Sequence, residues 1–192
     1  MAVGTTGILG GVFDPPHNGH VALARAALRE LELAELLVLV VADPGHKGVV
    51  TPAETRLDLA RIAFEGVQRT TVELDSHART VDSLEERKPR DAVFVIGADE
   101  LVAFREWKSP ERVLELVRLG VAMRPGTSPD AVRAVARRLG DPMRVLEFEL
   151  EPVPVSSSEI RARVARGLSI DELVPSGVAG AIRRLGLYAA PE

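Results

Sequence analysis

Short apolar runs alternate with helical segments along the chain, and this alternation limits the fold more than any other feature. The run Leu36–Ala42 is apolar throughout, as expected for a parallel strand covered on both faces. The predicted strands are Thr5–Gly10, Leu36–Ala42, Thr70–Leu74, Ala92–Gly97, Leu119–Met123 and Val145–Leu150. Helices are predicted over residues 18–32, 52–66, 81–88, 109–117, 129–139, 157–166 and 177–185. Repeated strand–helix units predict an α/β protein with a doubly wound parallel sheet.

Local signals mark where several of these helices begin. The segments Thr51–Glu54 and Ser156–Glu159 each place a hydroxyl residue three positions before a glutamate, which predicts a capping box. Ser-Pro pairs at 109–110 and 128–129 place proline at the first helical position.

The length of 192 residues fits one domain with a small appendage. Because only helices are predicted after Glu151, we expect a nucleotide-binding α/β core over residues 1–150 and a C-terminal helical subdomain over residues 151–192. The net charge of −4 argues against a dedicated nucleic-acid binder.

The chain contains no cysteine, which excludes disulfides and thiolate chemistry. No basic region precedes the first apolar run, and no run approaches the roughly 20 residues that span a bilayer. We therefore expect a soluble, cytoplasmic protein that binds neither nucleic acid nor membranes.

A glycine turn and two histidines follow the first predicted strand, in the segment Gly10-Gly11-Val12-Phe13-Asp14-Pro15-Pro16-His17-Asn18-Gly19-His20. If a helix begins near His17, then His17 and His20 share one of its faces. The first N–H groups of that helix favour an anion. Two imidazoles beside a helix N-terminus are suited to hold a polyphosphate.

Three other interpretations compete with this one. A histidine pair at helical spacing often serves packing or lies on the surface. A zinc site has only His46 and His77 as further imidazoles, with no cysteine to complete it. The G-x-G-x-x-G fingerprint of dinucleotide binders is absent, which disfavours a cofactor-binding dehydrogenase.

A second motif, Ser156-Ser157-Ser158-Glu159-Ile160-Arg161, opens a helix near the C-terminus. Helix capping accounts for Ser156 and Glu159, but not for three serines followed by an arginine. A cation such as Arg161 is unfavourable in the first turns of a helix unless an anion answers it. Hydroxyls, N–H groups and a guanidinium together predict a phosphate-binding cradle.

The two motifs resemble those of the nucleotidyltransferase superfamily that carries an H-x-G-H motif, which implies a Rossmann-like fold. Further segments resemble the nicotinate mononucleotide adenylyltransferase family, and together they cover nearly the whole chain. These are Asp43-Pro44-Gly45-His46-Lys47, Thr55–Ala60, Gly97–Leu101 with Trp107, Val174-Pro175 and Gly186-Leu187-Tyr188.

The resemblance implies transfer of the adenylyl group from ATP to nicotinate mononucleotide, with Mg²⁺ bound to the ATP and no metal held by the protein itself. The catalytic residues implied are His17, His20 and Arg161. The ATP-binding residues implied are Gly10, Gly11, Phe13, Asp14, Gly19, Gly97, Asp99, Ser156, Ser157 and Ser158. The acceptor-binding residues implied are Lys47, Arg79, Thr80 and Trp107.

Two departures from the family pattern concern the acceptor. The family has a doubled proline before the histidine–lysine turn, where this chain has Asp43–Lys47. It also has S-Y/F-T where this chain has Ala78-Arg79-Thr80. Arg79 is able to pair with a nicotinate carboxylate, or it indicates a different acceptor.

The residues alone leave several alternatives open. Trp107 serves either as a core anchor or as a platform on which a ring stacks. Asp99 either binds ribose or caps a helix. A lysine in a loop, such as Lys47, is commonly just solvated. The alternative functions are the same chemistry on nicotinamide mononucleotide or phosphopantetheine, and a non-catalytic nucleotide sensor. The expected partners are ATP and a mononucleotide, and a homo-oligomer remains open.

Overall fold

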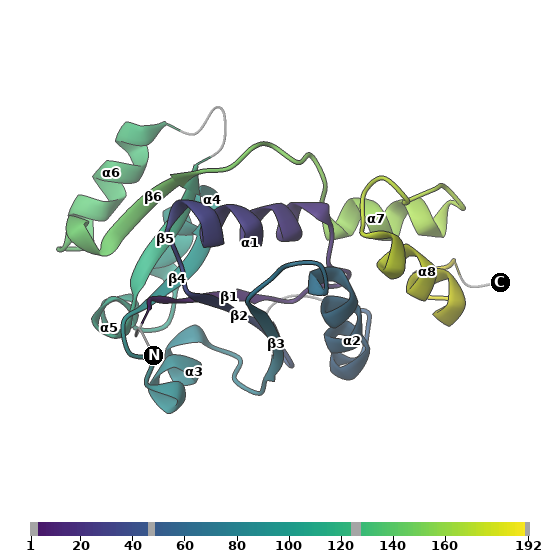
Figure 1. Ribbon diagram of the computed structural model, residues 1–192, viewed down its shortest axis with the longest axis horizontal. Coiled ribbons are helices and arrows are strands. Elements are labelled where there is room, and N and C mark those ends of the chain that lie inside the picture. Colours follow the sequence, from purple (N-terminus) through teal and green to yellow (C-terminus); the bar gives the residue numbers. More distant parts are fainter. Residues whose placement is uncertain (1–3, 46–48, 124–127, 191–192) are drawn as a thin grey trace.

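The protein is described by a computed structural model that covers residues 4–45, 49–123 and 128–190. The strands of this part of the chain form one parallel sheet in the order β3-β2-β1-β4-β5-β6 (Figure 1). They are β1 (Thr6–Gly11), β2 (Glu35–Val41), β3 (Thr70–Asp75), β4 (Ala92–Gly97), β5 (Arg118–Met123) and β6 (Val145–Glu149). This topology confirms the predicted doubly wound α/β fold. The strand order reverses between β1 and β4, and ligands of such sheets bind beyond the carboxyl ends of the strands there.

Helices cover both faces of the sheet, because its strands are apolar on both sides. One face is buried under α1 (Asn18–Glu30) and α2 (Ala53–Phe64). The other is buried under α3 (Thr80–Arg87), α4 (Ala98–Ala103), α5 (Pro110–Leu116) and α6 (Pro129–Arg138). The six-residue α4 and the 3₁₀ turns Phe104–Glu106 and Pro142–Arg144 were not predicted, because they are too short to show a hydrophobic period.

The two remaining helices, α7 (Ser157–Ala165) and α8 (Ser176–Leu185), lie at one end of the molecule beside α2 (Figure 1). Ile160 of α7 and Val178 and Ile182 of α8 belong to the same buried cluster as the apolar residues of α1 and α2. A shared core of this kind fixes the C-terminal helices against the sheet. The division of the chain at residue 150 stays a prediction.

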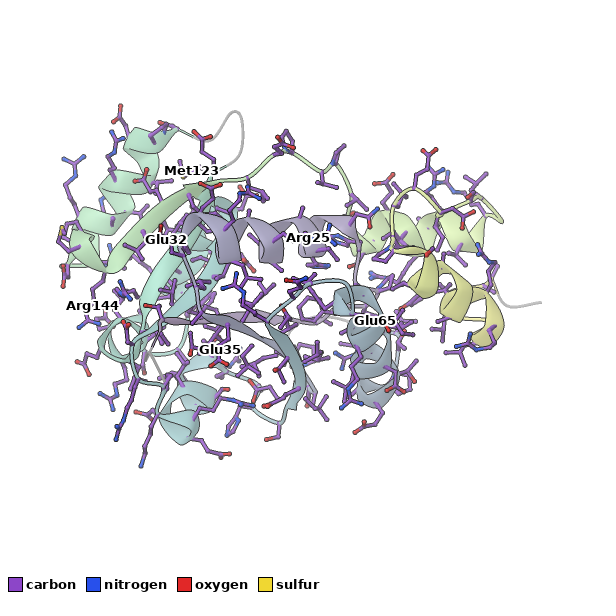
Figure 2. All side chains as sticks on the ribbon, in the orientation of Figure 1. Arg25, Glu32, Glu35, Glu65, Met123 and Arg144 are labelled. Carbon is purple, nitrogen blue, oxygen red and sulfur yellow. The ribbon has the colours of Figure 1, made fainter. Side chains whose placement is uncertain are left out.

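Polar contacts tie the elements on the α1 face together. The Arg25 guanidinium on α1 donates to the carbonyl of Gly66 beyond α2, with Nη2 3.4 Å from the oxygen (Figure 2 labels Arg25).

No helix in the described ranges is long and apolar enough to cross a membrane.

The two predicted capping boxes have different outcomes. The Ser156 hydroxyl accepts a hydrogen bond from the backbone N–H of Glu159 at 3.2 Å, so Ser156 is the N-cap of α7, as predicted. The prediction for Thr51 is wrong, because α2 has Pro52 as its N-cap and no side-chain cap. The buried Thr51 hydroxyl instead donates to the Tyr188 hydroxyl at 3.1 Å, so a tertiary partner replaces the local one.

Candidate active site

The histidine pair lies where β1 gives way to α1, at the carboxyl edge of the sheet. His17 is the N-cap of α1, and its ring stacks on that of His20 with the centroids 3.7 Å apart. The backbone N–H of His17 donates to Nδ1 of His20 at 3.2 Å. A neutral His20 ring therefore carries its proton on Nε2, where it can donate to a ligand. The structure brings the two rings together as the spacing predicts, and their catalytic role stays a prediction.

Close packing explains why glycines surround this pair. A Cβ on Gly19 would lie 3.1 Å from Nδ1 of His17 and 3.3 Å from Cγ1 of Val155. A Cβ on Gly11 would lie 2.8 Å from the Phe13 ring, whose centroid is 4.9 Å from that of His20. At Gly10 a Cβ would lie 3.2 Å from the ring of Phe94. These glycines make room for the rings, and their contact with ATP stays a prediction.

The second motif meets the first although they are far apart in the chain. Nη1 of Arg161 donates to the carbonyl of Asp14 at 2.6 Å, and the Ser157 hydroxyl donates to the carbonyl of Pro15 at 2.8 Å. Ser158 accepts from Nη2 of Arg161 at 3.4 Å and keeps its own hydroxyl proton to donate. The N-terminus of α7 is therefore fixed beside the segment between β1 and α1, residues 12–17, which we call the histidine turn. Ser157 has to break its bond to Pro15 before its proton reaches a phosphate.

The Asp14 side chain is buried and bonded to the protein rather than turned to solvent. Its Oδ1 accepts from the Tyr188 hydroxyl at 2.7 Å, and its Oδ2 accepts from the backbone N–H of Val50 at 2.9 Å. Burial raises the pKa of Asp14, but its polar neighbours Thr51, Val50 and Tyr188 and the charge of Arg161 outweigh burial and lower this pKa. Burial, together with the bond to Asp14, raises the pKa of Tyr188, which therefore stays protonated. The carboxylate joins the histidine turn to the C-terminal tail.

This network predicts a pH-dependent loss of stability on replacing Tyr188 with phenylalanine. The folded pKa of Asp14 lies below its unfolded value of about 3.8, so its stabilisation is complete above that value and is lost as the pH falls through the folded pKa. We expect Tyr188→Phe to lower the free energy of unfolding by about 1.5–3 kcal/mol at pH 7, because a charged acceptor loses its donor. Urea unfolding from pH 7 down to pH 3 measures the difference from the wild type, which should shrink as Asp14 protonates. A difference that stays constant over this range would contradict the network.

Gly97 ends β4 and is the N-cap of α4. Its backbone N–H donates to Oε2 of Glu100 at 3.1 Å, so the capping carboxylate of α4 is Glu100. Asp99 lies exposed in the first turn of the same helix. Helix capping is therefore assigned to Glu100, and the ribose-binding role of Asp99 stays a prediction.

The predicted acceptor residues occupy two places along the same edge. Arg79 is exposed and is the N-cap of α3, and Thr80 is the first residue of that helix. Trp107 is half-buried, with its ring centroid 5.1 Å from that of Phe104 and 6.0 Å from that of Phe94. Trp107 is thus at least a core anchor. Lys47 and its neighbour His46 lie outside the described residues.

His77 precedes the predicted acceptor residues and has partners that the sequence analysis did not identify. Its Nδ1 lies 3.0 Å from Oδ1 of Asp75, and its Nε2 lies 3.2 Å from Oε2 of Glu86. The hydrogen bond to Asp75 is the main reason that the pKa of His77 is raised. The carboxylates of Asp75 and Glu86 thus fix the orientation of the His77 ring, two residues before Arg79.

Arg56 and Tyr188 are two further residues for which no role was predicted. Arg56 is buried on the stripe of α2 that also buries Ala60 and Phe64. A basic residue on an apolar stripe is a signal that the sequence already contains. For Tyr188, the contact with Asp14 depends on the tertiary fold and has no comparable local signal.

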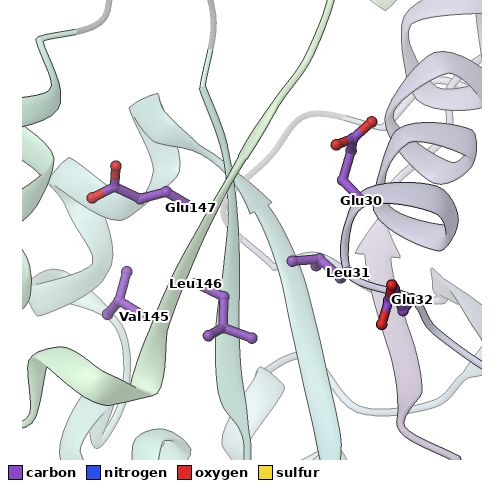
Figure 3. Close-up of a pocket in the computed structure, with 6 residues that line it drawn as sticks. All are labelled: Glu30, Leu31, Glu32, Val145, Leu146 and Glu147. Atoms are coloured by element: carbon purple, nitrogen blue, oxygen red, sulfur yellow. The ribbon is translucent and has the colours of Figure 1, made fainter.

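A pocket of about 470 Å³ lies elsewhere, between the C-terminal end of α1 and β6 (Figure 3). Its lining residues are Glu30, Leu31, Glu32, Val145, Leu146 and Glu147. The 13 residues of α1 separate it from the histidine pair by about 20 Å. Its carboxylates, those of Glu30, Glu32 and Glu147, would repel a polyphosphate, so this pocket is disfavoured as a triphosphate site.

Comparison with known proteins shows to which family the chain belongs. Residues 8–163 match the family model described as cytidylyltransferase-like. The chain is 38% identical over 191 residues to a probable nicotinate-nucleotide adenylyltransferase of Bordetella avium, covering 95% of this chain and 96% of that protein. It is 36% identical to one of Thermomicrobium roseum, covering 97% of this chain and 92% of that protein.

Among solved structures, the chain is similar to the nicotinic acid mononucleotide adenylyltransferase of Plasmodium falciparum. The structure of that protein with NaAD superposes with a TM-score of 0.78 at 17% identity, covering 96% of this chain and 97% of that one. Its structure with APC gives a TM-score of 0.76. These matches establish the fold, and the sequence matches establish the family. The chain therefore belongs to the nicotinate-nucleotide adenylyltransferase family, within the cytidylyltransferase-like group.

Proposed function

We propose that the chain transfers the adenylyl group of ATP to nicotinate mononucleotide, releasing nicotinate adenine dinucleotide and pyrophosphate. The names of its relatives support this reaction. The observation that carries the proposal is the junction of the two motifs, in which Arg161 bonds Asp14 and Ser157 bonds Pro15. We infer that this junction brings the imidazoles of one motif and the guanidinium of the other within reach of one triphosphate, which both groups and the helix N-termini beside them would favour.

In the proposed reaction, a phosphate oxygen of the acceptor attacks the α-phosphorus of ATP in line. The bond from that phosphorus to the oxygen bridging it to the β-phosphorus breaks, and pyrophosphate leaves with the bonding electrons. The attacking phosphate is already ionised at pH 7, so no general base is required. Catalysis then consists of positioning and charge stabilisation. His17 and His20 act on the α- and β-phosphates, and Arg161 with Ser158 acts on the β- and γ-phosphates.

We propose that Mg²⁺ enters with ATP and is not a resident ion. Both side-chain oxygens of Asp14, the acidic residue that precedes the histidines in the sequence, accept hydrogen bonds from the protein. Within the described residues, no group of three or more His, Asp or Glu side chains is placed to hold a metal. An arrangement of side chains such as this fits a magnesium ion whose ligands are phosphate oxygens and water. When bound, it offsets the charge of the phosphates.

We propose Arg79, Thr80, Trp107 and Lys47 as the residues that bind the acceptor. We propose Gly97 and Asp99 as residues that bind ATP. Arg79 is exposed at the start of α3, and a guanidinium matches a carboxylate in a bidentate pair. Nicotinate carries this carboxylate and nicotinamide lacks it.

Replacing Arg79 with alanine should therefore weaken discrimination between the two mononucleotides. A charged hydrogen-bonded pair contributes about 1.5–3 kcal/mol, so we expect KM for nicotinate mononucleotide to rise about 10- to 100-fold. KM for nicotinamide mononucleotide should change little. Arg90→Ala, at an exposed arginine just beyond the other end of α3, is the matched control. Equal changes in KM for both mononucleotides would show that Arg79 does not recognise the carboxylate of the acceptor.

Isotopically labelled ATP tests the reaction itself. With label on the α-phosphate, the label should appear in the dinucleotide, and with label on the γ-phosphate it should appear in pyrophosphate. ATP binding without either product would instead support the nucleotide sensor.

A further inference from the structure

Arg56 is the largest fully buried side chain that the structure describes, and 1% of its surface is exposed. It lies in the first turns of α2, whose neighbouring positions bury leucine and alanine side chains. A buried guanidinium is unfavourable unless its N–H groups find acceptors. The identity of those acceptors therefore indicates what the residue does.

All the hydrogen bonds found for Arg56 in the described ranges go to backbone carbonyls. Nε donates to Thr51 at 3.0 Å, and Nη1 donates to Val12 and to Val41, both at 2.8 Å. Nη2 donates to Ala42 at 2.7 Å. One side chain thus binds the β1–α1 loop and both ends of the β2–α2 connection.

These carbonyls lie where two neighbouring strands leave the sheet. The register pairs Gly11 of β1 with Val40 of β2, so Val12, just past β1, and Val41, the last residue of β2, lie beyond the ladder between these two strands. Carbonyls beyond the end of a ladder need other donors when they are buried. Arg56 supplies donors at the carboxyl edge, where ligands of such sheets bind.

Asp14 also binds the segment between β2 and α2. Its Oδ2 accepts from the backbone N–H of Val50, next to the Thr51 carbonyl that Arg56 binds. Asp14 itself lies two residues after Val12 and belongs to the histidine turn. The turn and the β2–α2 connection are therefore joined twice, once by a cation and once by an anion.

We propose that Arg56 is a positioning residue for adenylyl transfer, which it serves by bracing the backbone of the histidine turn against the β2–α2 connection. Arg56 acts through the backbone and does not touch the substrate. This proposal rests on the proposed function, because the brace matters for catalysis only if the histidine turn holds the reacting phosphates. A displacement of about 1 Å at such a site can cost about 100-fold in rate.

The test compares Arg56→Met and Arg56→Lys with a control at the opposite edge of the sheet. Methionine fills much of the volume without any donor, and lysine keeps the charge but has a single nitrogen that cannot span all the carbonyls. The control is Arg69→Met, because Arg69 also binds backbone carbonyls, those of Leu33 and Ala34, at the start of β2. All variants are assayed well below their unfolding temperatures.

We expect Arg56→Met to lower kcat about 100-fold, Arg56→Lys to lower it less, and Arg69→Met to leave it within about twofold. KM for ATP should change less than kcat, because the groups proposed to bind ATP remain. A purely structural Arg56 would lower the unfolding temperature and leave kcat unchanged. An Arg56→Met variant with kcat within twofold of the wild type, or an equal drop in Arg69→Met, would overturn the proposal.

Hydrogen exchange separates this inference from the proposed function. The amide hydrogens of residues 12–14 and 49–51 should exchange about tenfold faster in Arg56→Met than in the wild type or Arg69→Met. Unchanged exchange there would overturn the brace. A wild-type protein that exchanges as expected but releases no pyrophosphate would contradict the proposed function alone.

Discussion

His20→Ala is expected to lower kcat by about 10²- to 10³-fold, the usual cost of losing one donor that stabilises developing charge. The His20 ring is held against His17 and Phe13, and its Nδ1 accepts the backbone N–H of His17. This leaves Nε2 as the proton donor of the neutral ring. Steady-state pyrophosphate release measures the loss, with far-UV circular dichroism as the check that the variant is folded.

His20→Asn is the informative companion variant. The asparagine Oδ1 takes nearly the position of Nδ1, so the variant keeps an acceptor for the His17 N–H and loses only the distal donor. Its stability should therefore match the wild type more closely than that of His20→Ala, while its kcat should be equally low. Near-normal turnover in a folded His20→Asn would contradict the proposed role of His20.

Arg161→Ala is expected to raise KM for ATP by about 10- to 100-fold, because a charged hydrogen bond contributes about 1.5–3 kcal/mol. Arg161 is held beside the histidine turn by its bond to the Asp14 carbonyl and lies next to Ser158. Isothermal titration calorimetry with a non-hydrolysable ATP analogue measures the loss of ATP affinity separately from turnover.

Arg166→Ala is the control for this change, since Arg166 ends the same helix and its Nε binds the Ala162 carbonyl. It should leave ATP affinity unchanged. Unchanged ATP affinity in Arg161→Ala as well would contradict the phosphate cradle.

The hydrophobic pattern was sufficient to predict the sheet. Buried strands such as β2 and β4 are apolar at almost every position, and glycines or polar residues bound them, so each predicted strand lies within a residue or two of its observed bounds. The helix α4 was missed because six residues do not complete two turns. The prediction that Thr51 caps α2 was wrong because the buried Thr51 hydroxyl donates to Tyr188, near the other end of the chain, and not to a group of α2.

The site was predictable where the chemistry lies within one short segment. The spacing of His17 and His20 fixes a shared face before any tertiary contact forms. The bonds of Arg161 to Asp14 and of Tyr188 to Asp14 connect residues from opposite ends of the sequence. Such contacts are set by how α7 and α8 pack beside α2, which no local pattern encodes.

The most direct test of the proposed adenylyl transfer measures pyrophosphate release from ATP and Mg²⁺, with nicotinate mononucleotide and nicotinamide mononucleotide compared side by side. We predict release with a strong preference for the nicotinate form, expressed as the ratio of kcat/KM values. Equal or greater activity with the nicotinamide form would contradict the proposed acceptor, and no release with either form would contradict the proposed reaction.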